Sequence, residues 1–176
     1  MPRSEQTWLH HVTTAGPAWQ PRCNSGNTIH PAMGIPEHPT IKTAADAFAA
    51  VALAAVACDG ELAAVEARSL RQQLEFRLPF RTYSDAAMAE LLDRLLTILR
   101  LQGWPALVAQ AAPCLNAEQS ETALAVAASL TQADHVESSA ETSFLGQLSE
   151  ALSVAPDRAA TIREVVALLN RDSLTS

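Results

Sequence analysis

The chain has 176 residues, of which 48% are hydrophobic and only 5% are aromatic, and its formal net charge is −7. This length suits one domain with a core of its own, and many Ala and Leu residues with few aromatics favour packed helices over a β-sandwich. Residues 43–176 carry nine basic and 17 acidic side chains. That balance argues against a nucleic-acid partner, because binding to phosphates requires clustered Lys and Arg.

Residues 1–42 are predicted to be an irregular or disordered leader. The first 39 residues hold six of the ten prolines and four of the five histidines, which is typical of turns and extended segments. Trp8 and Trp19 would allow this leader to dock onto the domain. The leader lacks the apolar stretch of a secretory signal, and the three cysteines are widely spaced, so we expect a cytoplasmic protein with reduced thiols.

The rest of the chain, residues 43–172, predicts one all-α domain, a compact bundle of about six to seven helices. An Ala-rich helix covers residues 44–57 and ends before Gly60, and a second helix covers residues 63–76 before Pro79. The longest apolar stretch, Ala47–Cys58, has 12 residues, whereas a membrane span needs about 20. We therefore expect no integral membrane segment.

Capping residues predict the later helices. Ser84 is suited to cap a Leu-rich helix up to Gly103, after which a short piece runs to Pro113. Asn116 and Gln119 form a capping box at the start of the next helix, and Ser138 with Glu141 forms a second one. Pro156 is expected to begin the last helix.

The domain contains an internal repeat. Residues 50–75 and 125–150 align without gaps at an offset of 75, with eight of 26 positions identical. The pairs include Asp59 with Asp134 and Glu66 with Glu141, so an Asp is followed by a Glu seven residues later in both copies. Each half is predicted to be a helix, an acidic elbow and a second helix.

The acidic elbows are the candidate metal site. An aspartate at a helix C-terminus faces the negative end of the helix dipole and needs an offsetting positive charge. The N–H groups of the following helix or a shared cation would supply it, and oxygen ligands favour Ca²⁺, Mg²⁺ or Mn²⁺. The candidate ligands are Asp59, Glu61 and Glu66 in the first half and Asp134, Glu137 and Glu141 in the second.

A purely structural role competes with metal binding at these positions. Glu141 is explained without a metal if it forms the capping box with Ser138. Glu66 lacks this explanation, because Ala63 at the corresponding position cannot cap. The first elbow is therefore the stronger candidate, and the second is its degenerate partner.

The segment "ALAAVACDGELAAVEARSL" resembles the signature of the TerB-like tellurite-resistance family, and the resemblance extends over about residues 43–170. It implies an all-helical fold with two pseudo-repeated halves, a cluster of acidic residues for a divalent cation, and a non-enzymatic role in stress response. Cys58 stands where the family usually has Ala, and His135 stands where it has Gly. The second departure marks the second elbow as the degenerate partner of the first.

Two alternatives to this function remain open. The chain is instead a protein-interaction scaffold if the acidic residues serve only in capping and solubility. The surplus apolar residues in helices 84–101 and 161–169 permit a homodimer or another protein partner. A redox enzyme that handles tellurite through Cys58 has less support. Apolar and acidic neighbours raise rather than lower a thiol pKa, and no catalytic motif is present.

Overall fold

The computed structural model describes residues 39–58, 64–132 and 139–171. Within these ranges all regular structure is helical, which confirms the all-α prediction. The α-helices are α2 (Ala44–Val56), α3 (Ala64–Glu75), α4 (Asp85–Ala111), α5 (Ala117–Thr131), α6 (Ser139–Ala151) and α7 (Pro156–Asn170). Two short 3₁₀ helices, η1 (Phe80–Thr82) and η2 (Ala112–Cys114), precede and follow α4. None of the described helices combines the length and hydropathy that crossing a bilayer requires.

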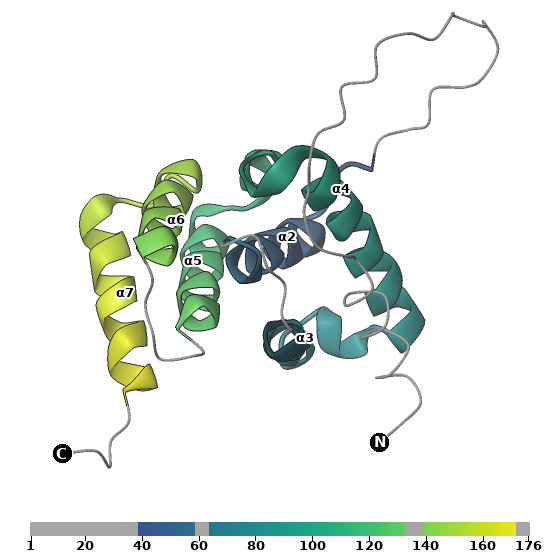
Figure 1. Cartoon of the computed structure of the whole chain (residues 1–176), viewed down its shortest axis with the longest axis horizontal. Coiled ribbons are helices and arrows are strands. Elements are labelled where there is room, and N and C mark those ends of the chain that lie inside the picture. The colour runs from purple at the N-terminus through teal and green to yellow at the C-terminus, as the bar shows by residue number, and fades with distance from the viewer. Residues whose placement is uncertain (1–38, 59–63, 133–138, 172–176) are drawn as a thin grey trace, which may run out of the picture.

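Helix α2 is the central helix of the bundle. Ten of its 13 residues are buried, as expected for a helix that is apolar on all sides. It packs most extensively against α4 and α5, and α3 packs against it as well. Figure 1 shows α2 between α4 and α5, with α6 and α7 farther out on the side of α5. The many alanines of α2 allow these neighbours to approach closely.

The predicted interruption at Gly103 is confirmed. Gly103 has φ 79° and ψ 169° and divides α4 into a long Leu-rich part and a shorter second part that contains Pro105. Immediately after the break, Trp104 makes an edge-to-face contact with Phe144 of α6, with ring centroids 4.9 Å apart. The contact that follows the break at Gly103 therefore connects α4 to α6.

The predicted helix starts at Ser84, Asn116 and Pro156 are also confirmed. The Ser84 hydroxyl accepts a hydrogen bond from the Ala87 backbone N–H, and Asn116 and Gln119 form the complete capping box. Pro156 occupies the start of α7. Because such caps involve residues only three apart, they can be recognised in the sequence alone.

Ile41 is the first buried residue in the described part of the chain. This residue falls within the segment predicted as leader, yet its side chain is buried in the core. The Cys114 thiol lies 3.9 Å from the Ile41 carbonyl oxygen. Residues 1–38 lie outside the described part of the chain.

Candidate functional site

The first elbow follows α2. The helix ends at Val56 with Ala57 as its C-cap, and the half-buried Cys58 packs against the core. Asp59 and Glu61 lie outside the described residues. Glu66 is the third residue of α3, and its side chain is also outside the described part.

The second elbow follows α5, which ends at Thr131. Asp134, Glu137 and the predicted capping residue Ser138 lie outside the described residues. Glu141 is half-buried in the first turn of α6, where it is the third residue of the helix. Glu66 and Glu141 therefore occupy the same position in the helix that follows each elbow.

The helix boundaries around the two elbows match at the repeat offset. Adding 75 to the last residue of α2 and to the first residue of α3 gives Thr131 and Ser139, the last residue of α5 and the first of α6. The two halves thus break and resume helical structure at equivalent positions. The helices before the elbows, α2 and α5, pack directly on each other, and α3 contacts both.

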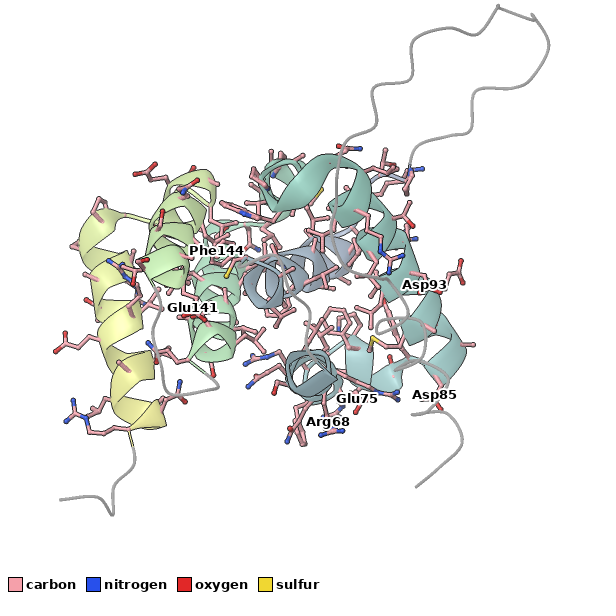
Figure 2. All side chains as sticks on the ribbon, in the orientation of Figure 1. Arg68, Glu75, Asp85, Asp93, Glu141 and Phe144 are labelled. Carbon is pink, nitrogen blue, oxygen red and sulfur yellow. The ribbon has the colours of Figure 1, made fainter. Side chains whose placement is uncertain are left out.

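An ion-pair network holds α3, the helix that carries Glu66. Arg71 donates hydrogen bonds to Glu75 one turn later and to Asp85 at the start of α4, the latter at 2.8 Å. The hydrogen bond to Glu75 is the main reason that the pKa of Arg71 is raised; partial burial opposes the rise and Asp85 adds to it. Arg71 therefore stays charged and links α3 to α4. In Figure 2, Glu75 and Asp85 lie well apart from Glu141.

Of the six predicted metal ligands, only Glu141 has a side chain within the described part of the structure. Among the described side chains, no three His, Cys, Asp or Glu residues are grouped closely enough to hold an ion. The histidines of the leader and Cys23 also lie outside the described residues.

Sequence analysis missed a buried carboxylate in α2. Asp46 is only 9% exposed, and its Oδ1 accepts a hydrogen bond from Arg94 Nη2 of α4 at 2.7 Å. Its backbone N–H donates a hydrogen bond to the hydroxyl oxygen of Thr43, the N-cap of α2. Asp46 thus lies in the first turn of α2 and has a structural role through its ion pair with Arg94. In the sequence, it is marked only by being the acidic residue of an otherwise apolar helix.

Sequence analysis also missed an open pocket of about 520 Å³. It lies between the start of α2, the segment 77–80 after α3, and the start of α5. Arg77, Phe48 and Phe80 are among its lining residues. The signal available in the sequence was the group "FRLPF", in which aromatic, basic and proline residues adjoin.

Comparison with known proteins yields no match: no family model fits the chain, and neither the curated proteins nor the solved structures include a significant relative. The resemblance to the TerB-like family stays a prediction that rests on the quoted segment and the repeat.

Proposed function

We propose that the chain is a non-enzymatic, TerB-like helical domain that binds Ca²⁺, Mg²⁺ or Mn²⁺ at its acidic elbows. The observation that supports this proposal is the match of helix boundaries at the offset of 75, which gives Glu66 and Glu141 equivalent positions. Duplicated helix pairs with duplicated acids are expected where the acids act together. The stress response to tellurite or metal oxyanions is the role that the resemblance implies.

The chemistry of the elbows favours a bound cation. Asp59 and Asp134 follow helices whose C-termini carry partial negative charge, and Glu66 and Glu141 begin the next helices. Carboxylates gathered in one place repel one another, and a divalent cation relieves that repulsion. The proposed ligands are all hard oxygen donors, which suit Ca²⁺, Mg²⁺ and Mn²⁺.

Isothermal titration calorimetry of the full chain with Ca²⁺ and Mn²⁺ tests the site. We expect saturable heat from the wild type and its loss from the double variant Asp59→Ala, Glu66→Ala. The variant Asp134→Ala, Glu141→Ala should lose less, since the second elbow is the degenerate one. At about 100 times the Kd, a bound ion should also stabilise the wild type by roughly 2.7 kcal/mol.

A charge-matched control uses Glu90 and Glu150. Both are exposed helical carboxylates outside the elbows. The double variant Glu90→Ala, Glu150→Ala removes the same charge as the elbow variant and should bind metal as the wild type does. Equal, negligible heats from the wild type and the Asp59 and Glu66 variant would refute the cation site.

The alternative function, a protein-interaction scaffold, is favoured by the outer face of α7. Only Ala159 and Val166 of this helix are buried, whereas Val165, Leu168 and Leu169 are exposed. An exposed apolar face of this kind is typical of an interaction surface. If α7 pairs two copies, the variant Leu168→Ser, Leu169→Ser should convert a dimer into a monomer in sedimentation analysis. A monomeric wild type would exclude a homodimer on this face.

A further inference from the structure

The pocket between α2, segment 77–80 and α5 has the size of a small-molecule site. Its volume of about 520 Å³ lies within the range of roughly 300–1,000 Å³ that is usual for ligand pockets. Glu141, the predicted metal ligand whose side chain the structure describes, is not among its lining residues.

One wall of the pocket is apolar. The centroids of the Phe48 and Phe80 rings lie 6.2 Å apart. Leu115, which follows η2 and precedes α5, also lines the pocket. Leu78 lies on the same lining with 68% of its surface exposed. An apolar ligand would remove this leucine from water, which is favourable in proportion to the buried area.

Arg77 supplies a positive charge beside this wall. Its guanidinium carbon lies 5.9 Å from the centroid of the Phe48 ring. Its Nε is buried without a hydrogen-bond partner in the described structure, and no described carboxylate forms an ion pair with it. The guanidinium therefore has no counter-charge among the described carboxylates, and an anionic ligand in the pocket would supply one.

Two helices begin at the pocket and add to its positive potential. Ala44 and Ala45 are the first residues of α2, and Glu118 is the second residue of α5. The first N–H groups of a helix have no partner within it, and this end of the helix dipole is positive. The carboxylate of Glu118 is the opposing charge, and it is exposed to water.

We propose that this pocket binds a small amphiphilic carboxylate, such as a medium-chain fatty acid. The carboxylate would pair with Arg77, whose planar guanidinium matches its two oxygens. The alkyl chain would cover Phe48, Phe80 and Leu78. The charge of the polar end and the apolar wall beside it together select this class over neutral or cationic amphiphiles.

Calorimetric titration of the full chain with dodecanoate, below the concentration at which it forms micelles, tests the proposal. We expect saturable binding of one dodecanoate per chain and no binding of dodecyltrimethylammonium. Arg77→Gln should weaken dodecanoate binding about tenfold or more, since it removes a charge-assisted hydrogen bond. Arg81→Gln, which changes a nearby exposed arginine outside the lining, should leave it unchanged.

The variant Glu118→Gln is expected to change dodecanoate affinity in the opposite direction to Arg77→Gln. Removal of this exposed negative charge should strengthen dodecanoate binding about twofold to threefold, and the change leaves the core intact. It keeps the proposal testable if Arg77→Gln does not fold.

The proposal is wrong if the wild type does not bind dodecanoate or if dodecyltrimethylammonium binds equally well. It is also wrong if Glu118→Gln weakens dodecanoate binding. Nuclear Overhauser contacts between Trp8 or Trp19 and Phe48 would assign the pocket to the leader of the chain itself and would likewise overturn the proposal.

Discussion

Among individual side chains, the pair of Asp46 and Arg94 has the clearest energetic consequence. The Asp46 side chain is 12% exposed and the Arg94 side chain 37% exposed, so water screens this pair less than a surface ion pair. Removing the arginine leaves a mostly buried carboxylate without its counter-charge, which is costly. The pair therefore fastens the start of α2 to the middle of α4.

We predict that Arg94→Met lowers the free energy of unfolding by about 1–3 kcal/mol, measured by urea denaturation. Methionine keeps much of the apolar stem, so the change reports the loss of the charge. Arg100→Met is the matched control, since Arg100 is exposed on the same helix, and it should stay within about 0.5 kcal/mol of the wild type. Equal stabilities of the two variants would show that the ion pair contributes nothing.

Within the helices, replacing Gly103 and Gly146 by alanine is expected to change the stability of the fold in opposite directions. Gly103 has a φ of 79°, which residues with a side chain rarely adopt, although a Cβ there would meet only Pro105 Cδ at an ordinary 3.5 Å. The cost of a side chain at Gly103 is therefore backbone strain. Gly146 lies inside α6, and a Cβ there would meet nothing within 4 Å.

Gly103→Ala should destabilise the fold by about 1–3 kcal/mol. Gly146→Ala should stabilise it by about 0.5–1 kcal/mol, because alanine is the better helix former. Thermal unfolding of both variants beside the wild type measures the two shifts. A stabilising Gly103→Ala would contradict the break in α4.

In the molecule as a whole, local sequence patterns were enough to predict the helices. The contacts between residues far apart in the sequence could not be predicted from these patterns. The caps at Ser84 and Asn116, the break at Gly103 and the start at Pro156 depend on residues close in sequence, and each was predictable. The ion pair of Asp46 joins residues 48 positions apart. The pocket likewise combines three distant segments, and no periodicity in the sequence indicates which helices meet.

The candidate metal site was predicted from the repeat rather than from any single motif. The helix boundaries support the repeat, because α6 begins at the residue that corresponds to the start of α3. Which carboxylates meet depends on how the two elbows fold, and those residues lie outside the described part of the chain, apart from Glu141 and the backbone of Glu66. The physical claim at stake is that both elbows share one cation.

Paramagnetic broadening of amide NMR signals by Mn²⁺ tests that claim most directly. With one equivalent of Mn²⁺, we predict that the signals flanking both elbows, those of Cys58, Ala64, Gln132 and Ser139, broaden together. The signals at the starts of α2 and α5, the far ends of the helices that lead into the elbows, should broaden least. Ca²⁺ should compete with Mn²⁺ and restore the broadened signals. Broadening at only one elbow, or uniform weak broadening over the whole chain, would contradict a shared site.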